Sequence, residues 1–362
     1  MYKAQALLIL LSIQAISCAL GFQIGPLLST CVDACQKGCI EIRKVQASRE
    51  QGRDNVDASV VFKDVNDPRS ALTAADNLSQ KMIVGSLRSH WGKHLRIVGE
   101  EDGNEELAKE ISRMIEENAF AKLDTTLFDD DLVETADIDP SEITIYVDPL
   151  DGTREFVEGR LENCQVLVGV AIGGEAVAGA IGIPFPSGNL TDDETIVYGL
   201  ADFGTGVRGT LLRRGPYPLE KHIDGIKYPR PHHATGDSSA AVMEASRKAA
   251  IKRFGGSNVI YGGAGNKILA AALGEVTCSI QHMVGGPWDL CAPEAILKGM
   301  GGRMTDLFGN EIDIYRNDHP RCNEWGYIAS PPGAESMFHE ALVSALRSCP
   351  EVQEYKKNVM GE

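Results

Sequence analysis

The chain has 362 residues, of which 43% are hydrophobic and 24% are charged, enough to bury a large core in one domain or in two packed domains. Its 51 acidic and 35 basic residues give a formal net charge of −16. This balance argues against nucleic-acid binding but not against a small anionic substrate, since a bound metal can supply local positive charge. Beyond the N-terminus no apolar run is long enough to span a membrane, so no stable membrane insertion is expected.

The first residues have the pattern of a secretory signal. Lys3 precedes an apolar run from Ala4 to Leu20, and Ser17 and Ala19 place small residues around a candidate cleavage site. Residues 1–19 are therefore interpreted as a signal peptide, and the mature chain is expected in the secretory lumen or outside the cell. A plastid leader, an uncleaved anchor and a buried first helix are the alternatives.

Residues 26–213 are predicted to form an N-terminal α+β domain that binds metal. Cys31, Cys35 and Cys39 recur every four residues on the first helix, where buried packing is favoured over metal binding because no histidine stands nearby. Residues 124–141 are expected to form an acidic surface loop. Helices are predicted at 26–46, 71–88 and 105–119, and strands at 60–63, 95–98, 143–147, 164–172, 176–183, 195–200 and 206–213.

A Pro- and Gly-rich stretch from Arg214 to Pro231 marks the expected seam between two domains. Beyond it, helices at 239–254 and 265–273 alternate with a strand at 258–261, which predicts a C-terminal α/β domain over residues 232–350. The fold class is therefore α/β, an α+β half followed by an α/β half, with the functional site at their interface.

The stretch from Ile143 to Thr153 is the most informative. A β-branched run of strand length leads into Asp148-Pro149-Leu150-Asp151-Gly152, where Pro149 is expected to end the strand and Gly152 to allow a tight turn. Two carboxylates this close repel each other unless a cation lies between them, and oxygen ligands favour Mg²⁺ over Zn²⁺. For this motif taken alone, an acidic turn without a ligand is the simpler alternative.

Two further acidic segments have similar positions. Glu100 follows an apolar strand and a glycine, much as Asp148 follows its strand. Asp289 stands where a helix should begin, with Pro293 in its first turn, so a helix N-cap is the simpler alternative for it. Gly152 and Thr153 open another helix, whose free amides suit a phosphate.

Together these features indicate metal-assisted hydrolysis of a phosphate monoester. No evident catalytic histidine or cysteine accompanies the acidic segments, so the attacking water needs another proton acceptor. A threonine hydroxyl that relays the proton to a carboxylate can supply one, which draws attention to Asp76.

The ordered motifs Gly99-Glu-Glu-Asp102, Asp148-Pro-Leu-Asp-Gly-Thr153 and Trp288-Asp289-x-x-Ala292 give the chain a family resemblance. It resembles the inositol monophosphatase superfamily of lithium-sensitive, Mg²⁺-dependent phosphatases. Within that superfamily, Thr73-Ala-Ala-Asp76 and Gly262-Gly-Ala-Gly-Asn-Lys267 are similar to the 3′(2′),5′-bisphosphate nucleotidases. The resemblance covers roughly Lys37 to Leu346 and implies a layered α/β/α/β/α sandwich.

The resemblance also implies roles for individual residues. Asp76 and Thr153 would activate the attacking water, and the amides of Gly152 and Thr153 would hold the scissile phosphate. Lys267 would face the second phosphate, although a helix-surface lysine is the simpler alternative for it. The Mg²⁺ ligands would be Glu100, Asp148, Asp151, Asp289 and the Leu150 carbonyl, and the nucleotide contacts would be Thr235, Ser238, Gly263 and Lys267.

One departure from the nucleotidase pattern bears on the substrate. After Thr235 that pattern usually continues Arg-Ser-His, whereas this chain reads Gly-Asp-Ser238, with Ser238 where a substrate-contacting histidine is expected. The prediction is an enzyme of nucleotide and sulfur metabolism that removes the 3′-phosphate of adenosine 3′,5′-bisphosphate to give AMP, with 3′-phosphoadenylyl sulfate as a further candidate substrate. The alternatives are an inositol phosphate or inositol polyphosphate 1-phosphatase, and a catalytically silent binding protein on the same scaffold.

Overall fold

The computed structural model describes residues 23–50, 61–62, 71–72, 74–92, 95–127, 138–211, 232–283, 285–316, 323–333 and 338–361. The predicted signal peptide, the predicted seam from Arg214 to Pro231 and most of the predicted acidic loop lie outside these residues. Within the described ranges, no helix combines the length and the apolar character needed to cross a membrane.

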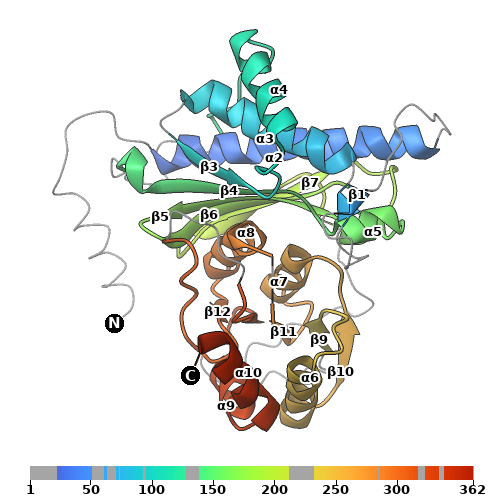
Figure 1. Ribbon diagram of the computed structural model, residues 1–362, viewed down its shortest axis with the longest axis vertical. Helices are drawn as coiled ribbons and strands as arrows, with labels where there is room; N and C mark the ends of the chain where they lie inside the picture. The colour runs from blue at the N-terminus through green and yellow to red at the C-terminus, as the bar shows by residue number, and fades with distance from the viewer. Residues whose placement is uncertain are drawn as a thin grey trace.

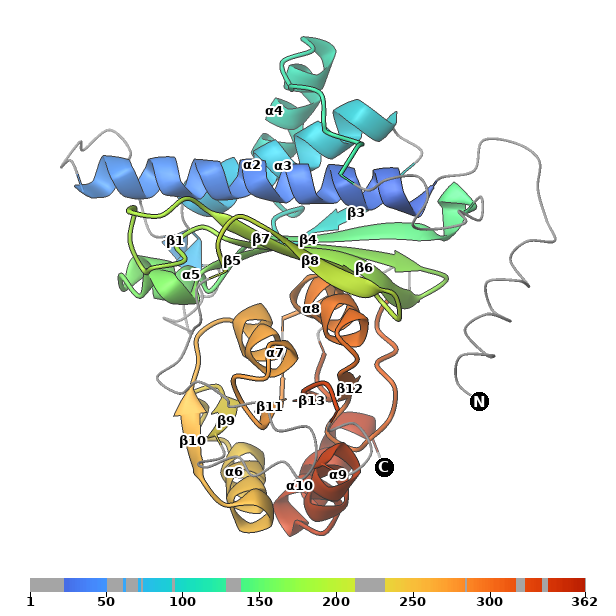
Figure 2. The ribbon, with the colours of Figure 1, turned by 180° about the vertical axis from the view of Figure 1, so that it is seen from behind.

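A six-stranded mixed sheet forms the larger β layer (Figure 1, Figure 2). Its strands lie in the order β3 (Arg96–Gly99), β4 (Ile143–Asp151), β5 (Gln165–Ile172), β6 (Glu175–Ile183), β7 (Thr195–Leu200) and β8 (Gly204–Arg208). β3 pairs with β4 in parallel, and the later neighbours pair antiparallel. Because Gly99 is in register with Val147, the parallel pair places Glu100 beside Asp148 at one edge of the sheet.

Two long helices, α2 (Ile24–Glu50) and α3 (Ala74–Trp91), cover the outer face of this sheet (Figure 1). Cys31, Cys35 and Cys39 of α2 are fully buried, and burial raises the pKa of the Cys31 and Cys39 thiols. The cysteine stripe is therefore core packing, as the sequence favoured. The next helix, α4 (Glu105–Glu116), projects away from the sheet.

A five-stranded sheet forms the second β layer. Its strands lie in the order β10 (Ser257–Ile260), β9 (His232–Thr235), β11 (Cys278–Gln281), β13 (Tyr327–Ser330) and β12 (Arg303–Thr305). Helices α7 (Ala264–Ala272) and α8 (Pro287–Gly299) lie between the two sheets (Figure 2). The outermost layer contains α6 (Ala241–Phe254), α9 (Glu340–Arg347) and α10 (Pro350–Met360).

These layers confirm the predicted α/β/α/β/α sandwich (Figure 1). The six-stranded sheet uses residues before 213 and the five-stranded sheet uses residues after 231, while the division into domains at 26–213 and 232–350 stays a prediction. α8 contacts the larger sheet closely, because a Cβ at Gly179 would lie only 2.6 Å from the Ala292 backbone. This close packing holds Asp289, one turn before Ala292, near the end of β4.

The end of β4 differs from the prediction. The strand does not end before Asp148 but continues to Asp151, and its register with β5 shifts between these two residues. The bulge lets the strand pass Pro149, which has no amide to donate to β5. The turn comes at Gly152, whose φ is +88°, and it is followed by the short helix α5 (Thr153–Val157). The two carboxylates therefore lie on a bulged strand end and not on a tight turn.

Other boundaries also differ: α2 runs to Glu50 and not to residue 46, and α4 ends at Glu116 and not at residue 119. Ala71–Leu72 forms strand β2, paired with β1 (Val61–Phe62), so the helix predicted from residue 71 begins at Ala74. β8 covers Gly204–Arg208, earlier than the predicted 206–213. Short 3₁₀ turns, η3 (Pro140–Glu142) and η4 (Leu161–Asn163), precede β4 and β5.

Candidate active site

Three aspartates from two separate segments meet at the end of β4. Oxygens of Asp148, Asp151 and Asp289 all lie within 4.8 Å of one another. Glu100, which directly follows β3, lies beside Asp148, and its charge is among the causes that raise the pKa of that carboxyl. The structure thus brings together the four acidic side chains that the sequence singled out as metal ligands, although that role itself stays a prediction.

Burial makes this cluster unfavourable without a cation. Asp148 is 2% exposed and Asp151 is 5% exposed. Burial raises the pKa of Asp148 well above its usual range, and the charges of Glu100, Asp151 and Asp289 raise it further. Burial, with the Glu100 and Asp151 charges, raises the pKa of Asp289 to about 8. Carboxylate oxygens that repel one another in this way fit a hard divalent cation such as Mg²⁺.

Asp151 also joins the two halves of the molecule. Its carboxylate oxygens accept hydrogen bonds from the backbone amides of Ala264 and Gly265, each at 2.8 Å, at the start of α7. A Cβ at Gly263, whose φ is +73°, would lie 2.6 Å from Asp151 Oδ2, so glycine is required there. The contacts hold the carboxylate in place while its remaining lone pairs stay available to a cation.

Thr153 and Asp76 form a polar pair beside the acidic cluster. The Thr153 hydroxyl lies 3.1 Å from Asp76 Oδ1 and 3.1 Å from the Leu150 carbonyl, and it can donate to either. Asp76 is fully buried in the first turn of α3. A hydroxyl that donates to Asp76 keeps its lone pairs free to accept a proton from water. The pair therefore has the geometry of a proton relay, and the Leu150 carbonyl keeps one lone pair beyond this contact.

The raised pKa values predict how stability depends on pH and on Mg²⁺. The folded pKa of Asp289, about 8, lies above its ordinary value of 3.8, so its contribution to stability is complete below about pH 4 and is lost as the pH rises through 8. Mg²⁺ takes the place of the bound protons. The Mg²⁺-induced rise in Tm should therefore grow from about pH 5.5 to about pH 8.

Differential scanning calorimetry with and without Mg²⁺ at each pH tests this expectation. At each pH, groups far from the cluster change the Tm equally with and without Mg²⁺, so their effect is absent from the difference between the two Tm values. An Mg²⁺-induced rise that stays constant across this pH range, or no rise at all, would contradict a cation site built from these carboxylates.

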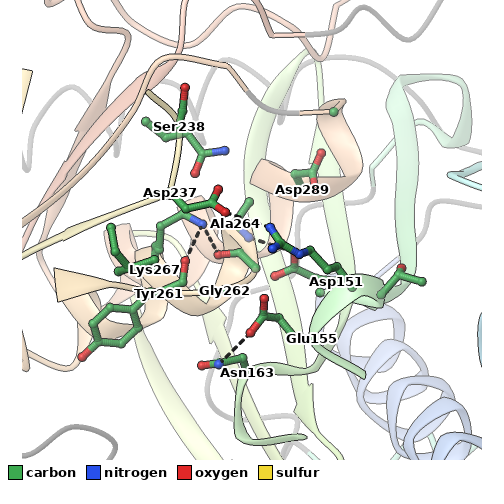
Figure 3. Close-up of a pocket in the computed structure, with 18 of the residues that line it drawn as sticks. Asp151, Glu155, Asn163, Asp237, Ser238, Tyr261, Gly262, Ala264, Lys267 and Asp289 are labelled. Atoms are coloured by element: carbon green, nitrogen blue, oxygen red, sulfur yellow. Dashed lines mark hydrogen bonds and ion pairs between the residues drawn. The ribbon is translucent and has the colours of Figure 1, made fainter. Parts of the chain in front are cut away.

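A cavity of about 740 Å³ opens beside the cluster (Figure 3). Asp151 and Asp289 line one part of it, and Lys267 and Ser238 line another. The cavity walls come from both halves of the chain, from the β4–α5 segment and from the loops after β9, β10 and β11. Gly152, Thr153, Ser238, Gly263 and Lys267 thus border one space large enough for a nucleotide, whereas Thr235 does not line it.

The predicted nucleotide contacts differ in their surroundings. Lys267 is 4% exposed, so it is not a helix-surface lysine, and its amine donates to the carbonyls of Tyr261 and Gly263. The Ser238 hydroxyl accepts a hydrogen bond from the Ala240 amide. Thr235 is fully buried, and its hydroxyl accepts a hydrogen bond from Arg247 Nε at 3.3 Å. A side-chain contact between Thr235 and a ligand would require this bond to change.

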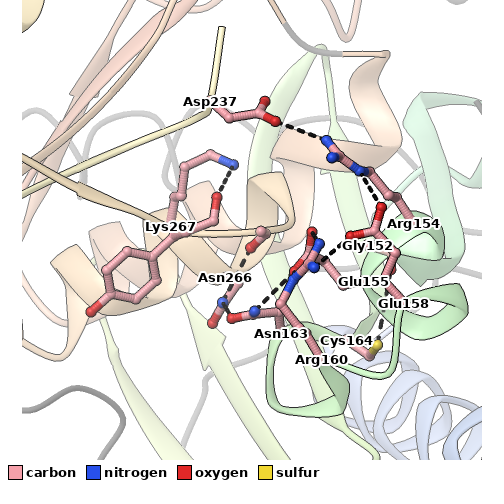
Figure 4. Close-up of polar contacts among 12 residues, drawn as sticks. Gly152, Arg154, Glu155, Glu158, Arg160, Asn163, Cys164, Asp237, Asn266 and Lys267 are labelled. Atoms are coloured by element: carbon pink, nitrogen blue, oxygen red, sulfur yellow. Dashed lines mark hydrogen bonds and ion pairs between the residues drawn. The ribbon is translucent and has the colours of Figure 1, made fainter. Parts of the chain in front are cut away.

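Several lining residues were not found from the sequence. Glu155 is held by Arg160 and Asn163, and Arg154 contacts Asp237 (Figure 4). Arg154 and Glu155 lie in the stretch from Thr153 to Gly159, which is similar to the bisphosphate nucleotidases, but that similarity gave neither residue a role. His282, Ile260 and Met283 also line the cavity, and nothing in their local sequence marked them.

Comparison with known proteins gives a matching family and named relatives. The sequence pattern of the inositol monophosphatase family matches residues 26–351. The 3′(2′),5′-bisphosphate nucleotidase 1 of Homo sapiens is 33% identical over 263 residues, which are 71% of this chain and 78% of that protein. The Golgi-resident adenosine 3′,5′-bisphosphate 3′-phosphatase of Rattus norvegicus is 27% identical over 337 residues, 88% of this chain and 80% of that protein. The solved structure of extragenic suppressor protein suhB from Bartonella henselae has the same fold, with a TM-score of 0.59 and 18% identity over 89% of this chain and 98% of that one.

Proposed function

The chain belongs to the inositol monophosphatase family of metal-dependent phosphatases, and on this premise we propose that it removes the 3′-phosphate of adenosine 3′,5′-bisphosphate, giving AMP and phosphate. The observation that carries the proposal is the gathering of three aspartate oxygens within 4.8 Å beside the Thr153–Asp76 hydrogen bond. A phosphatase needs both a site that neutralises phosphate charge and a proton acceptor for water. 3′-Phosphoadenylyl sulfate is the second proposed substrate.

Each part of the site has a proposed task. Glu100, Asp148, Asp151, Asp289 and the Leu150 carbonyl would hold Mg²⁺, which when bound supplies the positive charge that offsets the phosphoryl oxygens and the leaving alkoxide. The Thr153 hydroxyl, by donating to Asp76, accepts a proton from the attacking water and passes its own to the carboxylate. The amides of Gly152 and Thr153 orient the scissile phosphate.

Ile260 and Met283 give the cavity an exposed apolar surface, here called the apolar ledge, which favours a nucleotide over an inositol phosphate. Ile260 is 56% exposed and Met283 is 50% exposed, and both line the cavity. A purine has an apolar face that can cover these side chains, whereas an inositol ring bears a polar substituent on every carbon. This ledge supports the nucleotide assignment even though Ser238 stands where the nucleotidase pattern has histidine.

A substrate panel with matched variants tests the assignment. With Mg²⁺, phosphate release from adenosine 3′,5′-bisphosphate should exceed that from inositol 1-phosphate or from sugar phosphates. Ile260→Ser and Met283→Ser should each raise KM for the nucleotide by up to about tenfold, because an apolar contact with the base is lost. Phe203→Ser is the control, since Phe203 is 57% exposed in the β7–β8 turn and does not line the cavity.

The panel also decides between the alternatives. Preference for an inositol phosphate, with no effect of the two ledge variants, would identify an inositol phosphate or inositol polyphosphate 1-phosphatase. Phosphate release from no member of the panel would favour a catalytically silent binding protein. From the family resemblance, lithium is expected to inhibit the nucleotide reaction.

We also propose that the protein works in a secretory lumen. The apolar run from Ala4 to Leu20 and the similarity to the Golgi-resident rat phosphatase support this location. Sulfotransferases release adenosine 3′,5′-bisphosphate as a by-product, so a lumen that contains them would supply the substrate. A mature protein that retains residues 1–19 in the cytosol would contradict the proposal.

A further inference from the structure

Arg154 links the two halves of the molecule across the cavity. It follows Thr153 on α5, and its Nη1 lies 2.8 Å from Oδ2 of Asp237, in the loop after β9 (Figure 4). Its Nε donates to Glu158 at 2.8 Å. The Arg154 and Asp237 side chains line the cavity and are 37% and 52% exposed. Because so exposed an ion pair contributes little to stability, Arg154 can exchange Asp237 for another anion at small cost.

Asp237 also lies in the field of a second cation. Burial lowers the pKa of Lys267, and the charge of Asp237 is among those that oppose this effect. The Lys267 amine donates to two backbone carbonyls and not to a carboxylate. The Asp237 carboxylate thus lies at the cavity between an arginine and a buried lysine. Two cations placed in this way also suit an anionic group of a ligand.

The other cavity arginine is less suited to a ligand. Arg160 binds Glu155 through Nε at 2.6 Å and through Nη2 at 2.8 Å, and it also contacts Glu158. All three residues belong to the same short segment, and Glu155 is largely buried. Releasing Arg160 would leave the buried Glu155 carboxylate without its charged partner and with only the neutral Asn163 amide, whereas Arg154 pairs with the more exposed Asp237.

We propose that Arg154 is a further ligand of the non-scissile phosphate, beside the Lys267 that the family resemblance implies, and that Asp237 holds Arg154 until this phosphate displaces it. The inference rests on the proposed function in taking a bisphosphate as substrate. A phosphate carries more charge than a carboxylate and matches the planar guanidinium in a bidentate contact, so it replaces Asp237. A monophosphate leaves Asp237 in place, which makes Arg154 and Asp237 specificity-determining residues.

The test compares two nucleotides that differ only in the 5′-phosphate, adenosine 3′,5′-bisphosphate and adenosine 3′-monophosphate. Arg154→Gln should raise KM for the bisphosphate by about tenfold to a hundredfold with little change in kcat, while KM for the monophosphate stays nearly constant. Asp237→Asn should lower KM for the bisphosphate by up to about fivefold, because the competing carboxylate is lost. Arg113→Gln on α4, where the side chain is 67% exposed, controls for the loss of one positive charge.

Equal changes with both nucleotides in Arg154→Gln, or a higher KM for the bisphosphate in Asp237→Asn, would overturn the proposed role of Arg154. Because the two variants predict opposite shifts, a folding defect in one leaves the other informative. If the unsubstituted chain hydrolyses neither nucleotide, the proposed function fails separately. In that case, the same variants are compared on inositol 1-phosphate and inositol 1,4-bisphosphate. The proposed role of Arg154 is supported there only if the variants change KM for the bisphosphate and leave KM for the monophosphate unchanged.

Discussion

Asp148→Asn is expected to lower turnover by at least about a thousandfold while the protein remains folded. Asp148 is 2% exposed at the centre of the acidic cluster, and its Oδ1 accepts a hydrogen bond from the Leu150 amide at 3.0 Å. Asparagine has nearly the same volume and keeps an oxygen for this amide. It removes one negative charge from the cluster, so the cation that neutralises the phosphoryl group is held less tightly.

Melting temperatures separate this effect from unfolding. Burial raises the pKa of Asp148, and the charges of Glu100, Asp151 and Asp289 raise it further, so an uncharged side chain is favoured at this position when no cation is bound. Without a cation, the Tm of Asp148→Asn should equal or exceed that of the unsubstituted chain, and the Mg²⁺-induced rise in Tm should shrink.

A buried aspartate outside the cluster offers a matched control. Asp306 is 3% exposed, and its carboxylate accepts hydrogen bonds from the Phe308 and Asn310 amides in a turn. Asp306→Asn should show the opposite pattern, a lower Tm with kcat unchanged in the folded fraction. Full turnover in Asp148→Asn would rule out the proposed role of the cluster.

The fold could be predicted where its causes are local. The apolar runs that form β5, β6 and β7 and the Gly173-Gly174 turn between the first two are visible in the sequence, and the structure places these strands within a residue or so of the prediction. The five-layer arrangement came from the family resemblance and not from periodicity, because packing of one layer on another depends on contacts between distant residues.

The sequence was enough to predict which acidic residues form the site, but not how their side chains are positioned or which residues they contact. Asp151 accepts hydrogen bonds from amides 113 and 114 residues further along the chain. Local pattern cannot say which helix start a carboxylate will meet, just as it could not show that Arg154 pairs with Asp237. The bulge at Pro149 was missed for a related reason, since it depends on pairing with β5.

For Asp289 the structure corrects the helix N-cap interpretation, while its role as a metal ligand stays a prediction. The sequence set a helix N-cap against a metal ligand. In the structure the N-cap is Gly286, and Asp289 in the first turn of α8 accepts a hydrogen bond from the Gly286 amide at 2.7 Å. Its oxygen is also one of the three that gather within 4.8 Å. The capping contact orients the carboxylate and therefore does not exclude a cation.

Thr153 and Asp76 are expected to act as one catalytic unit. Thr153→Val removes the hydroxyl at nearly constant volume, and Asp76→Asn replaces the proton acceptor with a carboxamide that cannot take up a proton. Each should lower kcat by about a hundredfold to ten-thousandfold, because the hydroxyl lies 3.1 Å from the carboxylate and one relay serves both. The double variant should be no more than about threefold slower than the slower single variant.

Steady-state kinetics on the four proteins, with Thr153→Ser as the control that retains a hydroxyl, measures this coupling. Thr153→Ser should keep most of the activity, since serine can make the same contact with Asp76. The Mg²⁺-induced rise in Tm should be unchanged in all variants, because neither side chain is a proposed metal ligand. If the two single effects multiply in the double variant, the residues act independently and the relay is wrong. Multiplication is not expected from this structure, because Asp76 is fully buried and the Thr153 hydroxyl lies 3.1 Å from its Oδ1, which couples the two side chains directly.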